Sequence, residues 1–346
     1  RSVELGLRGR VLAHPITTSY GWTENATAAN AITANVAASL LGHDLACSDD
    51  GDVIFVGRPN VTTGNLMIFS RLNITGNNFT NIASLTPVST TTVISAGSGV
   101  DCNGDGSFVV IGARNSGAGS SGAFFIYART LITTWALQGA AITPTDITTN
   151  MRVGQSVAMS RDGQHVLIGA PGNTITAGGF YYYTRNDTIT TSLTQVATRI
   201  TATGLTSIVT ANLGTAIAIS GNGLVAAVGA PNDDINGGSV FIFTRSGSTW
   251  TQQMGTRRSA AAAGFIQYTG NVVTNAQFGA SLALNHDGSI LAVGGPNDTN
   301  TNAAAGRVWV YFINTTTSTW SSSNAPSQQI IAPTTTATQN CGFSIR

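Results

Sequence analysis

One segment of the chain, residues 154–185, has a pattern of apolar and polar residues that predicts three antiparallel strands in a row. An alternating apolar run ends at Ser160, and a second apolar run follows the pair Asp162-Gly163. Asp-Gly between two such runs is a strong hairpin signal, because both turn positions favour positive φ. A third run, rich in aromatic residues, follows a polar loop and ends at Arg185. We therefore expect a meander of three strands, with a bare two-residue turn between the first and the second.

The same pattern recurs five times at fixed spacing. Each copy opens on a glycine, has Asp-Gly or Asn-Gly eight residues later, and has another glycine fifteen residues after the first. The opening glycines are Gly42, Gly97, Gly154, Gly214 and Gly279. A fourth, less regular strand follows in each copy, and successive copies are 55, 57, 60 and 65 residues apart. Units of this kind, each too apolar on one face to stand alone, are typical of the blades of a β-propeller.

The two ends of the chain predict one more blade, to which both contribute. Residues 3–16 match the second and third strands of a unit, and residues 341–346 match the start of a first strand. Joining the C-terminal strand to three N-terminal strands would close the ring and leave no open sheet edge. We therefore predict an all-β fold, a single β-propeller domain over residues 1–346 with six four-stranded antiparallel blades. The alternatives are seven blades or a fragment of a longer array. The predicted blades span approximately residues 42–96, 97–153, 154–213, 214–278, 279–341, and 342–346 plus 1–41.

Charge is scarce and balanced along the chain. Charged residues make up 9% of it, the net charge is +1, and all 16 basic residues are arginine. This argues against nucleic acid or an anionic membrane as a partner. No apolar run approaches the ~20 residues of a membrane-spanning helix, so no membrane insertion is expected. The three cysteines (Cys47, Cys102 and Cys341) are expected to be free, because equivalent positions in adjacent blades are too far apart for a disulfide.

The long connections are expected to gather on one face of the ring. In a propeller, the second-to-third and fourth-to-first connections emerge on the same face, which we call the long-loop face. The opposite face, the turn face, carries the Asp-Gly turns. Because loops carry function on a rigid scaffold, we expect a ligand or partner on the long-loop face. The longest irregular segment there is predicted at residues 251–277. The candidate binding residues on this face are Asn232, Asp233, Asp234, Arg257, Arg258, Phe265 and Tyr268.

No catalytic constellation is evident in the sequence. The four histidines are scattered without metal-ligand spacing. A carboxylate pair for glycoside hydrolysis would have to come from Asp233, Asp234 and Asp298. We therefore expect no enzyme, no catalytic residue and no cofactor, with a propeller glycosidase as the least favoured alternative. A recurring arginine at the end of the third strand is expected to hydrogen-bond to the turn of its own unit. It stands at Arg71, Arg129, Arg185 and Arg245.

The sequence Gly-x-Ser-Val-Ala-x-Ser-x-Asp-Gly at residues 154–163, followed by Gly-Ala-Pro at residues 169–171, resembles the FG-GAP repeat. That family includes the N-terminal propeller of integrin α subunits, and the resemblance covers essentially the whole chain. It implies an extracellular setting and a role in adhesion or assembly. Calcium-binding members insert an Asp-rich loop between the first two strands, and Asp101, Asn103 and Asp105 come nearest to it. Val109 stands where the next carboxylate is needed, so the resemblance is to the non-calcium type, without a metal.

Seven Asn-x-Ser/Thr sequons fall in predicted loops or after third strands, and none interrupts a first or second strand. Such positions favour attachment of N-linked glycans if the protein is secreted by a glycosylating cell. The candidate asparagines are Asn25, Asn60, Asn73, Asn78, Asn186, Asn297 and Asn314.

Together these features predict a non-enzymatic adhesion or assembly module, outside the cell or on its surface. The expected partners are other extracellular proteins, glycans, or copies of the same chain in a cell-surface or filamentous structure. The alternative is a receptor head that binds a glycan or another ligand with its long-loop face. An uncharged surface rich in Thr, Asn and Ser is compatible with both.

Overall fold

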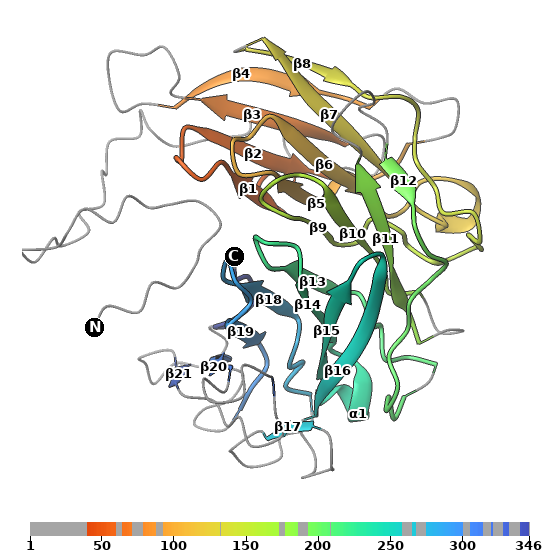
Figure 1. Ribbon diagram of the computed structural model, residues 1–346, viewed down its shortest axis with the longest axis vertical. Helices are drawn as coiled ribbons and strands as arrows, with labels where there is room; N and C mark the ends of the chain where they lie inside the picture. Colours follow the sequence, from red (N-terminus) through yellow and green to blue (C-terminus); the bar gives the residue numbers. More distant parts are fainter. Residues whose placement is uncertain are drawn as a thin grey trace, which may run out of the picture.

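The computed structural model describes residues 40–59, 64–70, 79–87, 93–131, 133–172, 177–185, 193–207, 209–257, 265–267, 275–299, 305–313, 320, 328–331 and 340–345. Within these residues the chain forms five sheets that follow one another around a common centre (Figure 1). In chain order the strands are β1 (Leu45–Cys47), β2 (Val53–Arg58), β3 (Asn65–Ser70), β4 (Thr80–Leu85), β5 (Ala96–Cys102), β6 (Phe108–Ala113), β7 (Ala123–Leu131), β8 (Thr134–Leu137), β9 (Val157–Met159), β10 (His165–Ala170), β11 (Gly179–Arg185), β12 (Leu193–Gln195), β13 (Ala216–Ile219), β14 (Val225–Ala230), β15 (Ser239–Ser246), β16 (Thr249–Arg257), β17 (Phe265–Gln267), β18 (Ser281–Leu284), β19 (Ile290–Gly295), β20 (Arg307–Phe312) and β21 (Gln328–Ile331).

Each predicted unit forms its own sheet, with the strands in sequence order. Four of the described sheets have four antiparallel strands: β1–β4, β5–β8, β9–β12 and β18–β21. The remaining sheet, β13–β17, has a fifth strand, since β17 pairs in parallel with β16. The predicted all-β, propeller-like architecture of antiparallel sheets is thus confirmed at this level. The only helical segments described are two single turns, η2 (Ala118–Ser120) and α1 (Asp233–Asn236).

The prediction of an irregular segment starting at residue 251 is wrong. Strand β16 stays paired with β15 as far as Arg257, which lies opposite Ser239, and Phe265 opens β17. The hairpin extends this far because a bulge between Ile242 and Phe243 absorbs an extra residue and keeps the later pairs in register.

The prediction of a bare two-residue turn is also wrong. In the third unit five residues, 160–164, connect β9 to β10, and Gly163 has positive φ (72°) whereas Asp162 does not. The Asp162 carboxylate accepts the backbone N–H of Gln164 at 2.9 Å, and the Ser160 hydroxyl accepts that of His165 at 3.0 Å. The side chains thus satisfy backbone donors that a tighter hairpin would have paired. The other four units repeat both bonds.

The hydrophobic core lies between neighbouring sheets. Each of its four clusters combines apolar side chains from two successive units. Phe55 of the first sheet meets Trp135 of the second edge-to-face at 5.1 Å, and Tyr182 of the third meets Trp250 of the fourth at 5.8 Å. These two tryptophans of fourth strands therefore pack against the preceding sheet. Since each sheet is covered only by its neighbours, the array is stable as a whole rather than sheet by sheet.

The glycine fifteen residues into each unit marks a close contact between sheets. A Cβ on Gly112 in β6 would lie closer than 3.0 Å to the carbonyl oxygen of Gly154, which opens the next unit. The equivalent glycines of the other four units make the same approach to the following opening glycine. A side chain at this position would push adjacent sheets apart, which explains why the spacing is invariant.

Residues 340–345 lie against the last sheet as the opening of a further unit. The Ser281 hydroxyl donates to the Gly342 carbonyl at 2.8 Å, just as the Ser156 hydroxyl donates to the carbonyl of Gly214 at 2.8 Å. Gly342 also has positive φ (82°), like the other opening glycines. The N-terminal strands predicted to complete this unit lie outside the described residues.

Two smaller predictions are confirmed where the structure describes them. The recurring arginines donate to backbone carbonyls of their own turns: Arg129 to Asp105 at 3.2 Å, Arg185 to Gly163 at 3.1 Å and Arg245 to Gly223 at 2.7 Å. Arg71 lies outside the described residues. Cys47, Cys102 and Cys341, all within the described residues, form no disulfide with one another. Among the described residues, no helix has the length and apolar character needed to cross a membrane.

Candidate functional site: the central pocket

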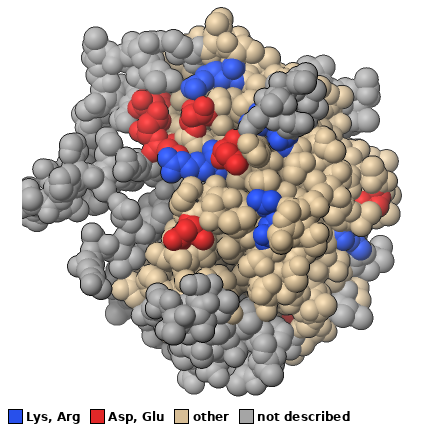
Figure 2. Space-filling model, in the orientation of Figure 1, with Lys and Arg blue, Asp and Glu red and all other residues tan. Residues whose placement is uncertain are grey.

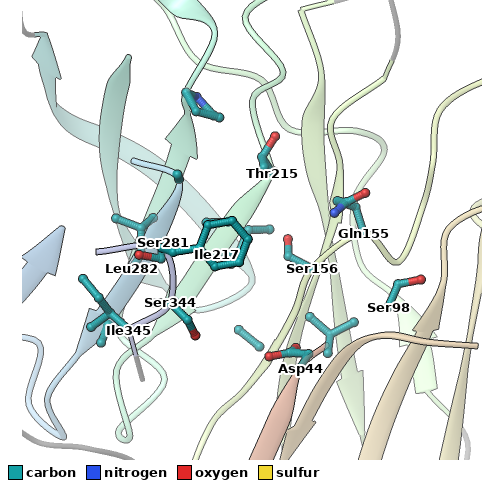
Figure 3. Close-up of a pocket in the computed structure, with 18 of the residues that line it drawn as sticks. Asp44, Ser98, Gln155, Ser156, Thr215, Ile217, Ser281, Leu282, Ser344 and Ile345 are labelled. Carbon is teal, nitrogen blue, oxygen red and sulfur yellow. The ribbon is translucent and has the colours of Figure 1, made fainter. Parts of the chain in front are cut away.

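A cavity of about 550 Å³ lies at the centre of the array, where the first strands of the sheets meet (Figure 3). Residues one to three places after each opening glycine line it, including those of the 340–345 segment. Pro231, Asn232 and Pro296, which follow second strands, also line it, and so do Asn212 and Gln277, which precede first strands. Both sets of connections belong to the long-loop face, so the pocket opens on the face where a ligand was expected.

One side of this pocket is polar, and most of its polar groups join neighbouring sheets. We call this side the polar wall; it consists of His43, Asp44, Ser98, Asp101, Arg114, Gln155 and Ser156. The Asp44 carboxylate accepts the backbone N–H of Val100 at 2.7 Å, which ties the first sheet to the second. The Asp101 carboxylate accepts the N–H of Met159 at 2.6 Å, which ties the second to the third. These carboxylates therefore hold neighbouring sheets together in the absence of a ligand.

The opposite side of the pocket is more apolar, with Thr215, Ser281 and Ser344 as polar members of its lining. We call it the apolar wall; it consists of Ala216, Ile217, Ala280, Leu282, Phe343 and Ile345. In Figure 3, Leu282 and Ile345 lie across the cavity from Ser98 and Gln155. Phe343 is 72% exposed, which is high for a phenylalanine, and it lines the cavity. The pocket therefore offers an apolar surface facing a polar one, as small-molecule sites commonly do.

Basic side chains gather at one edge of the polar wall. We call His43, Arg114 and Arg152 the basic edge. Burial, and secondly the positive charge of Arg152, lower the pKa of the Arg114 guanidinium from its usual value. Burial and then Arg114 lower the pKa of His43, while the nearby Asp44 acts in the opposite direction. An arginine keeps its charge under such a shift, so Arg114 brings a positive charge to the pocket and His43 is held neutral near pH 7.

Sequence reasoning missed the basic edge, although the repeat contained a signal for it. Arg114 stands seventeen residues after its opening glycine. The other four units have proline at that position: Pro59, Pro171, Pro231 and Pro296. Arg114 thus breaks the repeat and also lines the central cavity. A residue that departs from the structural pattern at such a place is a candidate for a functional role.

Of the seven candidate binding residues, Asn232 lines the pocket and Asp233 does not. Asp233 is fully buried, and its carboxylate accepts the backbone N–H groups of Thr206 and Ser207, each at 2.8 Å. It also accepts the hydroxyls of Thr206 at 2.7 Å and Ser239 at 2.6 Å. Asp233 therefore fixes one long loop to another, and its neighbour Asp234 is half-buried beside it. Asp298, the third acid of the hypothetical glycosidase pair, is also buried, 3.8 Å from Arg307.

For the remaining candidates the structure describes strand positions at most. Arg257 ends β16 and Phe265 begins β17, whereas Arg258 and Tyr268 lie outside the described residues. Of the glycosylation candidates, Asn297 alone is described; its amide donates to Gln277 at 2.7 Å. The other six, Asn25, Asn60, Asn73, Asn78, Asn186 and Asn314, lie outside the described residues.

The three residues nearest to a calcium loop have other partners in the structure. Asp101 binds the Met159 N–H, the Asn103 amide oxygen accepts the N–H of Phe108 at 2.9 Å, and Asp105 accepts that of Ser107 at 2.9 Å. These oxygens are directed to three different backbone segments. Among the described residues, no group of three or more His, Cys, Asp or Glu side chains is placed to hold a metal ion.

Some of the charge elsewhere on the surface is paired. On the face seen in Figure 2, acidic and basic side chains lie close to one another near the middle, and most of the remaining described surface is uncharged. The ion pair between Arg161 and Asp49, 2.6 Å apart, joins the third unit to the first. Arg114 differs, because none of the described carboxylates forms an ion pair with it; it donates a hydrogen bond to the Gln155 amide oxygen at 3.3 Å.

Comparison with known proteins finds structural likeness but no relative in sequence. The sequence matches no family model and no curated protein. The fold is similar to a functionally unknown protein from Desulfotomaculum acetoxidans DSM 771, with TM-score 0.52 and 15% identity over 87% of this chain and 73% of that one. It is also similar to the periplasmic gluconolactonase PpgL of Pseudomonas aeruginosa, with TM-score 0.49 and 14% identity over 83% of this chain and 72% of that one. At such identities the likeness bears on the fold alone.

The second of these structures corrects one expectation. The sequence led us to expect that the chain is not an enzyme, because no catalytic motif was found in it. A protein whose structure aligns with 83% of this chain is a gluconolactonase, so that expectation does not stand. The reaction of that protein is not transferred to this chain, because the same fold hosts unrelated functions.

Proposed function

We propose that the protein is a ligand-binding propeller that holds a small molecule in its central pocket. The observation that carries this proposal is the two-sided cavity of about 550 Å³ framed by the opening strands. Its volume lies within the range of roughly 300–1,000 Å³ that is usual for small-molecule sites. A ligand there would contact several sheets at once and would be oriented by the polar wall.

The position of the pocket supports the same proposal. It opens on the long-loop face, where the buried carboxylate of Asp233 locks two loops together beside Asn232. Rigid loops around a cavity lower the entropy that binding costs. This is a form of the ligand-binding alternative that the sequence suggested, with the site at the centre of the face rather than on residues 257–268.

The proposal is tested by filling the pocket. Ala280 lies on the apolar wall, and Ala280→Trp would occupy the cavity; Ser248→Trp, in an exposed turn, is the matched control. Ligand-detected NMR would measure binding of three probes: hexanol, hexanoate and methyl glucoside. We expect at least one probe to bind the wild type and Ser248→Trp and to lose binding in Ala280→Trp. If no probe bound the wild type, or if every probe that bound it also bound Ala280→Trp equally well, the proposal would be wrong.

We also propose that the ring has six blades and belongs to the FG-GAP class of repeats. The support is the segment 340–345, which lies against the sheet β18–β21 with the same serine-to-carbonyl bond found between earlier units. N-terminal residues with the pattern of second and third strands would pair with it. In this arrangement the pocket would be enclosed by six first strands.

A second candidate function is adhesion or assembly outside the cell, and one loop favours it. Ile235, 76% exposed, stands between Asp234 and Asn236, and all three have positive φ. A β-branched residue in that conformation is strained, and such strain persists at functional contacts. If Ile235 anchors a partner or a second copy, Ile235→Asn should abolish concentration-dependent association in sedimentation experiments. Wild type that stays monomeric at all concentrations and binds no protein or glycan would count against this function.

A further inference from the structure

We propose that the basic edge of the pocket binds an oxyanion, and that the natural ligand is an amphipathic carboxylate whose apolar part lies on the apolar wall. This inference rests on the proposed ligand-binding function and names the class of ligand. It assigns to Arg114 the role of the charged anchor, with Gln155 and His43 beside it.

The first argument is the state of Arg114. Its guanidinium is half-buried in the wall of the cavity and donates to the Gln155 amide oxygen at 3.3 Å, a long and neutral contact. None of the described carboxylates forms an ion pair with it, and Arg152 adds further positive charge nearby. A partly desolvated guanidinium next to a second one is unfavourable unless an anion compensates it, and a planar donor fork matches a carboxylate.

The second argument is that the other charged groups of the pocket already have partners. Asp44 accepts the N–H groups of Leu45 and Val100, and Asp101 accepts that of Met159. These hydrogen bonds direct the two carboxylates toward the junctions between sheets. Arg114, by contrast, forms no ion pair with a described carboxylate, although Asp44 and Asp101 line the same cavity. A negative group on a ligand would supply the ion pair that Arg114 does not form with the described residues.

The third argument concerns the rest of the ligand. The apolar wall faces the polar wall across the cavity, and Ile217 and Leu282 are 8% and 6% exposed, whereas Phe343 is 72% exposed. A free inorganic anion would leave this surface uncovered, and a purely apolar molecule would leave Arg114 uncompensated. A carboxylate with a hydrocarbon chain satisfies both sides, because its chain covers the apolar wall and its charged group pairs with Arg114.

The experiment measures, by titration calorimetry, how three small molecules bind the wild type and three arginine variants. Hexanoate, hexanol and sodium sulfate are titrated into wild type, Arg114→Gln, Arg114→Lys and Arg161→Gln. The last is the matched control, an arginine of the turn face that is remote from the pocket. We expect hexanoate to bind the wild type and Arg161→Gln equally well. Arg114→Gln should weaken hexanoate about 10- to 100-fold, the loss of a charge-assisted pair, with a smaller loss in Arg114→Lys. Hexanol affinity should be the same in all four proteins.

The outcomes separate this inference from the proposed function. Sulfate bound as tightly as hexanoate, with the same loss in Arg114→Gln, would mean that the edge binds anions without regard to the apolar wall and would overturn the amphipathic ligand. If hexanol bound as tightly as hexanoate, and if Arg114→Gln changed neither affinity, the anion site would be overturned. The pocket would remain a binding site. Failure of every probe to bind the folded wild type would overturn both. Circular dichroism of each variant confirms that it is folded.

Discussion

At the scale of single residues, the side chains that the sequence made conspicuous mostly hold the structure together. Asp233, Asp298 and Asp101 are all less than 4% exposed, and their carboxylates bind backbone or side-chain donors. A sequence shows that a carboxylate is present, but whether water or a buried N–H meets it depends on loops from other parts of the chain. The residue that we now regard as functional, Arg114, is instead one that departs from its repeat.

The role of Asp233 leads to a prediction for stability. Asp233→Ala should lower the free energy of unfolding by about 3 kcal/mol, because it leaves buried N–H and hydroxyl donors of Thr206, Ser207 and Ser239 without an acceptor. Asp234→Asn is the matched control; the adjacent side chain has no such network, and asparagine tolerates positive φ, so the change should stay within about 0.5 kcal/mol. Urea unfolding measures both. Equal stability of the two variants would show that the Asp233 network contributes little.

At the scale of elements, the spacing of glycines and the apolar alternation sufficed to predict the order of the first four strands in every described unit, but not the fifth strand β17. They did not suffice for the connections. Ser160 and Asp162 build a five-residue turn through their side chains, and a bulge extends β16 through Arg257. Alternation indicates which residues face a core, whereas side-chain capping and bulges are settled by local hydrogen bonds that the alternation does not encode.

The close approach of neighbouring sheets leads to a second prediction. Gly112→Ala should lower stability by about 3 kcal/mol or more, because the new Cβ overlaps the Gly154 carbonyl and two packed backbones have to separate. Gly247 serves as the control: it has positive φ (58°), and nothing lies within 4 Å of its hypothetical Cβ. Gly247→Asn should therefore cost less than about 1 kcal/mol. Thermal unfolding measures the stability of both variants. If Gly112→Ala were as stable as Gly247→Asn, the inferred contact between the sheets would be contradicted.

At the scale of the whole molecule, the repeat predicted sheets arranged around a centre, and the described structure has that arrangement (Figure 1). The cavity at the centre did not follow from the repeat. Its two walls arise because the lining residues that follow the opening glycines differ from unit to unit. The first three units contribute polar ones such as Asp44, Ser98 and Gln155, and later units contribute more apolar ones such as Ile217, Leu282 and Phe343. Which of them face each other depends on the ring, so the sequence alone did not show them as a site.

The proposed six-bladed ring predicts which residues of the two chain ends lie opposite each other. In the fourth unit Ile217 pairs with Val228, and the same register would pair Ile345 with Leu5. Paired Cα atoms of antiparallel strands lie about 4.5–5.5 Å apart, within disulfide range. With the three native cysteines replaced by alanine, Leu5→Cys plus Ile345→Cys should form a disulfide under mild oxidation, measured by thiol titration. Glu4→Cys plus Ile345→Cys, with side chains on opposite faces, should not. Free thiols in both pairs would contradict the proposed sixth blade.

The central claim is that the middle of the ring holds an amphipathic carboxylate, and a crystal soaked with a bromine-labelled hexanoate tests it most directly. Bromine scatters anomalously, so its position is located without assumptions about the ligand. The proposal predicts a bromine peak beside Leu282 and Phe343, with the carboxylate at the Arg114 guanidinium, and loss of that peak in crystals of Arg114→Gln. A bromine peak found only on the outer surface, or one in the pocket that is unchanged in Arg114→Gln, would contradict it.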